Sequence, residues 1–316
     1  MYISVIIVNY NTADHIRNCL KSIYGFLNSD TTEVIVVDNN STQRDIEKLS
    51  DEFPEANFQF RKVNDGFGCG CNFGAGIASG NYLLFLNPDI ILLDDSVLEL
   101  AGYLENNPDS GITSGLMVDE NRSVLYSFNE FPSFEWEFYQ LIGFGYKQKI
   151  ENLVSKKEIK ENIIFETDWF HGAVFMIRKS DFEKSGGFNK EYFMYYEDVE
   201  ICFNMKTKSD KKNVCLPSVR VFHHTRSSLG SESNDNIYMF HIHRSKIIFL
   251  RNYPVLKGLL LKLMGILYTV TRLAILPFWL KYKGQKKNKS NQLFKILKLY
   301  LSSSYVDNSK YEYIKS

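Results

Sequence analysis

The sequence predicts an α/β protein with a mostly parallel central sheet, followed by a basic, helical C-terminal extension. Short β-branched runs alternate with stretches of helical periodicity over the first 230 residues, which is typical of a parallel sheet. The charge then changes sign near residue 240, where an acidic chain becomes basic and apolar. With 316 residues, of which 44% are hydrophobic and 23% charged, the chain cannot be a disordered protein, a collagen or a small disulfide scaffold.

The elements can be assigned in order from these patterns. Up to residue 95, buried strands are predicted at 2–8, 33–37, 58–63 and 82–86, with helices at 15–27, 45–53 and 72–79. Beyond it we expect a helix at 95–106, strands near 111–118, within 167–178 and at 219–224, a helix with a glycine C-cap at 182–187, and a helix from 197. Residues 119–165 are irregular and aromatic, and we expect a lid or an acceptor-side insertion there.

The cysteines and the N-terminus favour a reduced, cytosolic setting. The five cysteines are odd in number and contain no Cys-x-x-Cys pair, which argues against a structural zinc site and a disulfide framework. The N-terminal apolar run has no basic residues before it and is too short for a signal peptide.

Polar side chains follow three of the predicted strands where each strand ends. They form the clusters Asn9-Tyr10-Asn11, Asp38-Asn39-Asn40 and Asn87-Pro88-Asp89. In open α/β sheets, ligands bind beyond the carboxyl ends of the strands. Three polar strand ends on one rim therefore predict a ligand site.

A glycine-rich segment, residues 64–76, opens the helix after the third strand. It lacks the Gly-x-x-x-x-Gly-Lys-Ser/Thr pattern of a phosphate-binding loop. The dinucleotide pattern Gly-x-Gly-x-x-Gly also fails, since its last position would be Cys71 or Phe73. Tight turns and close helix packing are the alternative explanation of these glycines.

Six short motifs occur in order along the first part of the chain. They are Ser4–Asn11, Val36–Thr42, Asn64–Gly68 with Asn72, Leu84–Asp89, Gly186–Phe188 and Tyr195–Glu200. Together they resemble the motifs of family 2 inverting glycosyltransferases with the GT-A fold, in the rhamnosyltransferase-like branch. The resemblance covers residues 2–230, so we expect a catalytic domain at 1–230 and a helical extension at 231–316 outside it.

The resemblance implies a metal-dependent hexosyltransferase reaction. A sugar, expected to be rhamnose from the branch, would move from a dTDP- or UDP-linked donor to a hydroxyl of a lipid-linked or polysaccharide acceptor. The setting would be bacterial cell-surface glycan synthesis.

The resemblance also implies a donor-binding set at the strand ends and in the glycine-rich segment. Asp38 matches the residue that hydrogen-bonds the donor base. Asn9 and Asn11 are expected beside the nucleotide, although an Asx-turn and a helix cap would also explain them. The full set is Asn9, Asn11, Asp38, Asn40, Gly66, Phe67, Gly68, Asn72 and Asn87.

Asp89 is expected to be the main ligand of Mg²⁺ or Mn²⁺. It ends the tripeptide 87–89, which stands where the family has an Asp-x-Asp-type motif, and Asn87 brings an amide oxygen without charge. A capping turn is the alternative role of the tripeptide. The family often has a late histidine ligand, which His223 or His224 would provide; spacing to the serines at 227–228 favours His223.

Asp198 matches the family's catalytic carboxylate, the base on the acceptor hydroxyl opposite the leaving group. Its neighbour Glu197 would orient the loop or the acceptor. Both could instead be first-turn helix acids stabilised by the helix dipole. Trp169, His171 and Gly172 resemble the acceptor-side strand, where an aromatic ring stacks on a sugar; core packing is their alternative role.

The net charge of zero hides a division along the chain. Residues 1–240 contain 22 basic and 35 acidic residues, whereas residues 241–306 contain 13 basic residues and no acidic one. The basic part is also apolar from about 255 to 280. Lysine and arginine interrupt this run and Pro277 would kink it, so a clean membrane span is not expected.

We expect this extension to form interfacial helices, near 255–280 and 293–301, on an anionic membrane surface. Trp279 and Tyr282 stand at the edge of the first helix, beside a polybasic cluster of Lys281, Lys283, Lys286, Lys287 and Lys289. The protein would then be cytoplasmic and peripheral on the inner face of the cell membrane. Packing on the catalytic domain or an oligomer contact is the alternative, and nucleic acid is disfavoured because Leu and Ile outnumber polar groups.

Two other functions stay open. A sugar nucleotidyltransferase shares the α/β nucleotide-binding class, but Asn9-Tyr10-Asn11 stands where its glycine-rich basic loop would follow the first strand. A non-catalytic protein that binds a nucleotide sugar would fit the asparagine at position 87.

Overall fold

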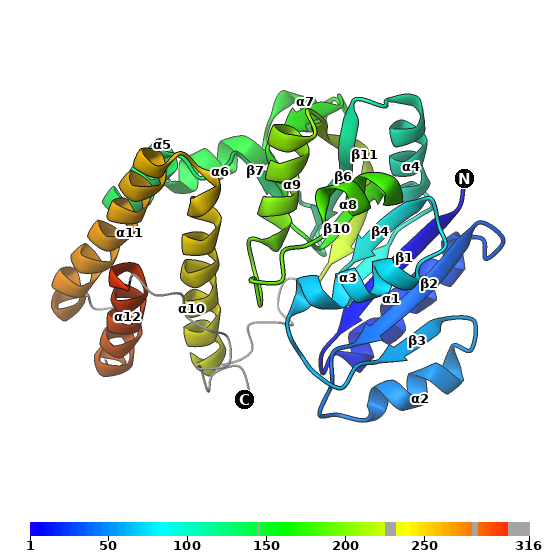
Figure 1. Cartoon of the computed structure of the whole chain (residues 1–316), viewed down its shortest axis with the longest axis horizontal. Coiled ribbons are helices and arrows are strands. Elements are labelled where there is room, and N and C mark those ends of the chain that lie inside the picture. The colour runs from blue at the N-terminus through cyan, green and yellow to red at the C-terminus, as the bar shows by residue number, and fades with distance from the viewer. Residues whose placement is uncertain (144–145, 225–231, 280–283, 303–316) are drawn as a thin grey trace. The chain divides into compact units, whose positions relative to one another are not determined.

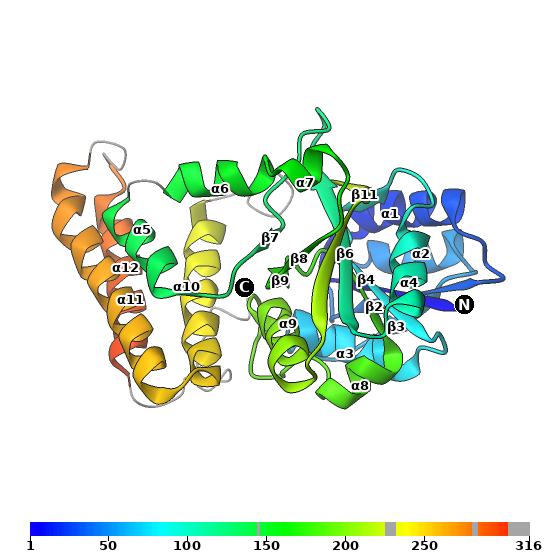
Figure 2. The same ribbon diagram turned by 90° about the horizontal axis from the view of Figure 1, so that it is seen from above.

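The computed structural model describes residues 1–143, 146–224, 232–279 and 284–302, and the chain packs as two compact units (Figures 1 and 2). The first unit comprises Met1–Phe131, Glu151–Lys190 and Glu197–Ser228. The second comprises Pro132–Ile150, Glu191–Tyr196 and Leu229–Ser316. The chain therefore passes between the units five times, whereas the predicted division at residue 230 is a single one.

The first unit alternates strands and helices as predicted. Its first part contains β1 (Ile3–Asn9), α1 (Ala13–Phe26), β2 (Thr32–Asp38), α2 (Asp45–Glu52), β3 (Asn57–Phe60), α3 (Phe67–Ile77), β4 (Tyr82–Leu86), β5 (Ile90–Leu92), α4 (Val97–Asn106) and β6 (Ser110–Val118). Its later part contains β7 (Phe128–Asn129), α7 (Lys157–Lys160), β8 (Phe165–Thr167), β9 (Trp169–Phe170), β10 (Val174–Arg178), α8 (Lys179–Ser185), α9 (Glu197–Lys208) and β11 (Lys212–His223). Gly186 caps α8 in the left-handed conformation, φ 83°, as the sequence predicts for a glycine there.

The central sheet has the strand order β3-β2-β1-β4-β10-β6-β11-β5, with β8 paired to β11. Strands β3, β2, β1 and β4 run parallel, and β11 is parallel to β6. Strand β10 is antiparallel to both β4 and β6. The predicted α/β class with a mostly parallel central sheet is confirmed. In the middle of the sheet, β10 runs opposite to the strands on both sides of it.

Helix α3 begins at Phe67, earlier than the predicted start at residue 72. Its glycines have low helix propensity, which is why the sequence indicates a turn. A Cβ atom at Gly70 would lie 2.8 Å from Cγ1 of Val8, and one at Gly74 would lie 2.6 Å from Cγ2 of Ile6. The glycines thus let α3 lie directly on β1, which agrees with the alternative explanation by close packing.

The stretch predicted as irregular, 119–165, contains helices. Among them are α5 (Phe134–Ile142), α6 (Tyr146–Val154) and α7. The pairing of β7 with β9 also begins there. The short strand β5 was also not predicted, because three apolar residues after a turn are too few to show the alternating pattern of a strand.

The second unit is helical. Its longer helices are α5, α10 (Glu232–Phe249), α11 (Val255–Ile275) and α12 (Lys286–Leu301), with the short 3₁₀ turns η1 (Leu250–Asn252) and η2 (Leu276–Phe278). The helices predicted near 255–280 and 293–301 correspond to α11 and α12. The predicted serine spacing at 227–228, Tyr282 and two lysines of the polybasic cluster, Lys281 and Lys283, lie outside the described residues.

Helix α10 was not predicted from the sequence, because polar groups lie on its buried side. Lys246 Nζ forms a buried ion pair with Oε2 of Glu137 at 2.5 Å. Nδ1 of His243 lies 2.9 Å from the hydroxyl of Tyr300, and this pair is also buried. A helix that buries histidine and lysine has no apolar stripe for a periodicity search to find.

Candidate functional site

The predicted rim forms in the first unit, at the carboxyl ends of β1, β2 and β4. Asn9 pairs in register with Asp38, and Ile7 pairs with Leu86, the residue before Asn87. Parallel pairing therefore brings all three polar strand ends to one edge of the sheet.

Asn9 and Asp38 are joined through a residue that the sequence did not single out, Ser41. Nδ2 of Asn9 donates to Oδ1 of Asp38 at 2.6 Å and to Oγ of Ser41 at 3.0 Å. The backbone N–H and the hydroxyl of Ser41 donate to Asp38 at 2.9 and 2.6 Å. Asp38 is 5% exposed, so its carboxylate is fixed in one orientation by these donors.

Asn11 and Asn40 shape the turns around this network. Both have left-handed backbone conformations, with φ of 57° and 61°. Oδ1 of Asn11 accepts hydrogen bonds from the backbone N–H of Thr42 at 2.8 Å and of Gln43 at 3.2 Å. Asparagine tolerates this conformation better than most residues, so the turn chemistry alone accounts for both positions. Their place beside the nucleotide stays a prediction.

The start of α3 lies against the same network through Asn39. Its Nδ2 donates to the carbonyl oxygen of Gly66 at 3.0 Å, and its Oδ1 accepts from Arg61 at 2.7 Å. Arg61 also forms a bidentate pair with Asp65 at 2.6 and 2.9 Å. Gly66 has a φ of 108°, a conformation that favours glycine. The sequence places Asn39 in the polar cluster at the end of β2 but does not reveal its partners, and Arg61 was not singled out because a residue that supports the rim has no motif of its own.

Gly68 brings α3 close to the start of α9. A Cβ atom there would lie 3.0 Å from Cβ of Phe188 and 3.6 Å from Cβ of Glu197. The ring of Phe67 lies edge-on to that of Phe188, with centroids 6.5 Å apart. The predicted donor segment and the predicted catalytic pair are therefore neighbours in space.

Asn72 binds main chain. Its Nδ2 donates to the carbonyl oxygen of Phe188 at 2.8 Å, and its Oδ1 accepts from the N–H of Phe188 at 2.9 Å. Both ends of the amide are used to hold the turn after Gly186 and Gly187 on α3. Its predicted approach to the donor stays a prediction.

The tripeptide 87–89 follows β4 and faces His223. The N–H of Asn87 donates to the carbonyl oxygen of Ala173 at 2.8 Å. Oδ2 of Asp89 lies 3.5 Å from Nε2 of His223, and both side chains are largely buried. Burial lowers the pKa of His223 below its ordinary 6.5, although Asp89 opposes this shift. The imidazole is therefore neutral near pH 7 and can offer a nitrogen lone pair.

His224 has different surroundings from its neighbour. Its ring lies edge-on to Phe222, with centroids 4.7 Å apart, and 5.8 Å from the ring of His15. His223 is the last residue of β11, and its Nε2 lies toward the Asp89 carboxylate, whereas the backbone N–H of His224 donates to the carbonyl oxygen of Asp89 at 3.3 Å.

Asp89 and His223 fit a divalent metal as two ligands. A carboxylate oxygen and a neutral imidazole nitrogen are donors that Mn²⁺ accepts, and Mg²⁺ is commonly held by one or two carboxylates together with substrate phosphates. Within the described ranges, no group of three or more His, Cys, Asp or Glu side chains gathers in a metal-binding arrangement. The protein would therefore supply part of the shell, and diphosphate oxygens the rest.

Asp198 lies in the first turn of α9 and is held from two sides. Its Oδ2 accepts the N–H of Gly172 at 2.7 Å, and its Oδ1 accepts the N–H of Val199 at 2.8 Å. Glu197 beside it is 6% exposed. The helix dipole favours both acids, as the alternative reading of the sequence has it, and this leaves a fixed carboxylate beside the predicted acceptor segment.

Trp169 and His171 lie on the segment that leads to Gly172. Nε1 of Trp169 donates to the carbonyl oxygen of Glu130 at 2.9 Å, and its ring lies edge-on to Tyr126. The backbone N–H of His171 donates to the carbonyl oxygen of Ser127 at 2.8 Å. The segment is thus fixed in place by β7 and its neighbours.

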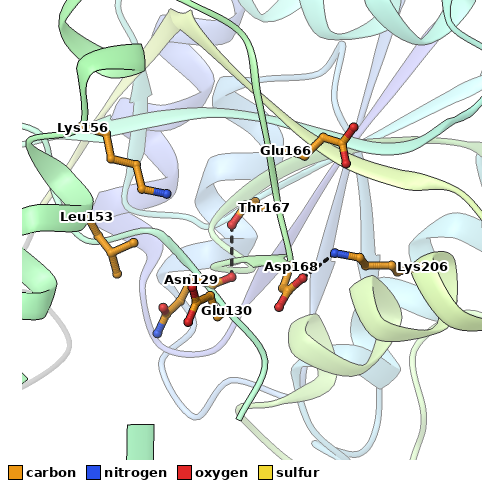
Figure 3. A pocket seen from close by; sticks show the side chains of 8 residues that line it. All are labelled: Asn129, Glu130, Leu153, Lys156, Glu166, Thr167, Asp168 and Lys206. Carbon is orange, nitrogen blue, oxygen red and sulfur yellow. Dashed lines mark hydrogen bonds and ion pairs between the residues drawn. The ribbon is translucent and has the colours of Figure 1, made fainter. Parts of the chain in front are cut away.

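A cavity of about 150 Å³ adjoins this segment (Figure 3). Lys206 donates to Oδ1 of Asp168 at 2.6 Å on one side of it, and Thr167 donates to the carbonyl oxygen of Asn129 at 3.1 Å. It is lined by Asn129, Glu130, Leu153, Lys156, Glu166, Thr167, Asp168 and Lys206. The hollow is polar and adjoins the segment predicted to meet the acceptor.

Comparisons with known proteins point to one family. The model of glycosyl transferase family 2 matches residues 4–186, more than half of the chain. The chain is 28% identical over 243 residues to rhamnosyltransferase WbbL of Escherichia coli (strain K12), covering 72% of this chain and 87% of that protein. It is 26% identical over 258 residues to an N-acetylglucosaminyl-diphospho-decaprenol L-rhamnosyltransferase of Mycobacterium tuberculosis (strain ATCC 25618 / H37Rv), covering 78% and 83%.

Solved structures share the fold. GalNAc-T7 with UDP, GalNAc and Mn²⁺ aligns with a TM-score of 0.61 at 14% identity, over 96% of this chain and 56% of that one. The chain thus spans about half the length of that protein. The mannosyltransferase PcManGT from Pyrobaculum calidifontis, in complex with GDP-Man and Mn²⁺, aligns with a TM-score of 0.58 at 16% identity, over 96% and 88%.

Proposed function

The chain belongs to glycosyl transferase family 2, and from this premise we propose that it moves a sugar from a nucleotide diphosphate donor to a hydroxyl of a lipid-linked glycan. It has the GT-A fold and is similar to rhamnosyltransferases. The observation that carries the proposal is the placement of Asp198. Its carboxylate is fixed by the N–H of Gly172, and Glu197 beside it approaches the predicted donor segment at Gly68.

Asp198 is the base of an inverting transfer. As the acceptor oxygen bonds to the anomeric carbon, the carboxylate takes the hydroxyl proton, and the bond from that carbon to the diphosphate oxygen breaks with its electron pair. A single base on the face opposite the leaving group gives one displacement and inverted configuration. The backbone N–H groups of Gly172 and Val199 hold this carboxylate in one orientation for the transfer.

Asp38, held by Asn9 and Ser41, binds the donor base, which is uracil or thymine. Asp89 and His223 would hold the metal, which when bound would neutralise charge on the departing diphosphate. The carboxylate suits Mn²⁺ or Mg²⁺, and the neutral imidazole favours Mn²⁺. Asn87 contributes its backbone N–H to the Ala173 carbonyl, which keeps the tripeptide beside the acceptor segment.

The acceptor is a sugar linked to a lipid diphosphate, presented at the inner face of a bacterial cell membrane. Support for this class comes from the mycobacterial relative, which is named for a diphospho-decaprenol-linked acceptor, and from the basic, apolar C-terminal helices. Rhamnose as the transferred sugar rests on the two rhamnosyltransferase relatives.

A thermal-shift panel with UDP, dTDP, GDP and NAD, each with and without Mn²⁺ or Mg²⁺, tests the donor side. A ligand at 100 times its Kd stabilises a protein by about 2.7 kcal/mol, which raises the melting temperature measurably. We expect a metal-dependent shift with UDP or dTDP. A shift with NAD alone, or none with any diphosphate, would contradict the proposal.

A transfer assay tests the chemistry. Nucleoside diphosphate release is followed with a polyprenyl-diphosphate-linked acceptor, comparing wild type with Asp198→Asn. Loss of a general base typically costs about 10²–10⁴-fold in rate. The matched control is Glu183→Gln, an exposed carboxylate on α8. A folded Asp198→Asn variant with undiminished transfer would remove Asp198 from the mechanism.

A further inference from the structure

We propose that helix α11 of the second unit lies in the plane of an anionic membrane leaflet and inserts a defined apolar row into it. We call this row the α11 stripe: Leu256, Leu259, Leu260, Leu263, Leu267 and Val270. This inference rests on the proposed function, which places the acceptor in a membrane. It adds the surface of the protein that contacts that membrane.

The stripe is exposed along the whole of α11. Leu256 is 71% exposed, Leu259 58%, Leu263 49% and Leu267 42%. At 3.6 residues per turn, the six side chains fall within an arc of about 100° around the helix axis. An apolar row of this length on the surface of a folded protein marks an interaction site.

The buried side of α11 faces the opposite way. Leu261, Met264, Gly265 and Thr269 are buried and occupy the other half of the helical wheel. Gly265 lies against Tyr300 of α12, and Arg272 donates to the carbonyl oxygen of Gln140 in α5 at 3.1 Å. The helix therefore uses one side to pack within its unit, and the stripe is not needed for that packing.

An in-plane position fits better than a span. By length and composition Val255–Phe278 could cross a membrane, with a mean hydropathy of 1.8. However, Gly265 is in the middle of α11, and α12, which packs there, carries Lys286, Lys287 and Lys298. A spanning α11 would draw the lysines of α12 toward the hydrocarbon, at a high free-energy cost. In the plane, these lysines stay in water.

Charge identifies the surface as anionic. Lys257 and Lys262 lie about 110° from the centre of the stripe, one on each side. Nζ of Lys257 lies 3.8 Å from the ring centroid of Tyr253, and Nζ of Lys262 donates to the carbonyl oxygen of Ser302 at 3.4 Å. From both positions a long lysine side chain can turn to a lipid phosphate. No acidic residue occurs from 241 to 306, and the acids of the same unit on α5 are paired with lysines, Glu135 with Lys149 and Glu137 with Lys246. A protein partner with an apolar groove would not require this uniform sign, whereas an anionic leaflet does.

Vesicle flotation of the full chain tests the proposal. Vesicles contain phosphatidylcholine alone or mixed with phosphatidylglycerol. We expect flotation with the anionic vesicles, weakened by salt, and a fall of about tenfold in the partition coefficient for the pair Leu263→Ser with Leu267→Ser. Equal binding to neutral vesicles, or unchanged binding of the variant, would overturn the proposal.

The matched control is Ile163→Ser with Ile164→Ser, two aliphatic residues of the first unit that are 45% exposed each. It should float like wild type. If the leucine pair does not fold, the pair Leu256→Ser with Leu260→Ser tests the other end of the stripe. Retention of the protein in membranes after alkaline carbonate extraction would overturn the in-plane position. If the leucine substitutions instead dissociate a dimer and leave vesicle binding unchanged, the proposal of a lipid partner would be overturned.

The donor-dependent thermal shift separates this inference from the proposed function. Stripe variants should keep the full shift with the nucleotide diphosphate, because the stripe belongs to the other unit. Flotation itself needs neither donor nor acceptor. If the protein floats with anionic vesicles but its melting temperature does not change with any nucleoside diphosphate, the proposed function is contradicted and the membrane role of the stripe is supported.

Discussion

The backbone N–H of Gly172 donates a hydrogen bond of 2.7 Å to Oδ2 of Asp198, and position 172 has little room for a side chain. A Cβ atom there would lie 3.2 Å from Cβ of Asp198 and 3.3 Å from Oδ2. The acceptor segment and the carboxylate thus touch without an intervening group. A methyl group at position 172 would require the Asp198 side chain to shift by a few tenths of an ångström.

Gly172→Ala should lower kcat for transfer by about 10–100-fold, because small displacements of a catalytic group are costly. Binding of the nucleotide diphosphate should be unchanged, since the donor network around Asp38 is elsewhere on the rim. Steady-state kinetics with both substrates measures the effect. Gly102→Ala, where a Cβ would meet nothing within 4 Å, is the control and should keep wild-type kcat.

Gly70→Ala should destabilise the first unit by about 1–3 kcal/mol through overpacking. The new methyl group would meet Val8 at 2.8 Å and the side-chain amide of Asn39 at 3.0 Å. Gly76→Ala in the same helix has nothing within 4 Å and should stabilise by up to about 1 kcal/mol. Urea unfolding of both variants makes the comparison, and equal effects would contradict close packing of α3 on β1.

Asp89→Asn and His223→Gln should each raise the Mn²⁺ concentration needed for half-maximal transfer by about tenfold or more, since the first removes the negative charge of the ligand and the second removes the imidazole nitrogen. A chelator should abolish wild-type activity, and added Mn²⁺ should restore it. His224→Gln is the matched control, because that ring lies against Phe222 and His15. A larger effect at His224 than at His223 would reverse the assignment.

The second unit should lose stability as the pH falls. Burial lowers the pKa of His243 to about 3 and that of His241 to about 4, both below the ordinary 6.5. Below pH 6.5 these two histidines bind protons in the unfolded chain but stay neutral in the folded chain. The free energy of unfolding therefore falls toward pH 4. The slope is about 1.4 kcal/mol per pH unit for each histidine.

His243→Gln tests this dependence by urea unfolding between pH 7 and pH 5. The variant loses the hydrogen bond to Tyr300 and is less stable at pH 7. Its stability should nevertheless depend less steeply on pH than that of wild type. Parallel curves for the two proteins would contradict a neutral, buried His243.

The rim could be predicted because strand ends are local in sequence. A β-branched run followed by Asn9 or Asp38 indicates both a strand and the point where it ends. Parallel pairing then aligns the ends of neighbouring strands. The sequence places Asn39 and Ser41 beside Asp38 but does not show what they bind, because their partners Gly66 and Asn9 lie 27 and 32 residues away. Asn72 carried a motif, yet its amide is used on Phe188, 116 residues later. The sequence likewise could not reveal α10, whose buried polar residues find partners on α5 and α12.

The segment Glu191–Tyr196 packs within the second unit and is followed at once by Glu197 and Asp198 of the first. Arg251 pairs with Glu191 at 2.9 Å, and Ser245 donates to the carbonyl oxygen of Met194 at 2.7 Å. A protein cut at residue 230 would lose these anchors and leave the left-handed tyrosines 195 and 196 without their ring contacts to α10. The C-terminal helices cannot be removed as an appendix, so their role has to be separated from catalysis by point substitution and not by truncation.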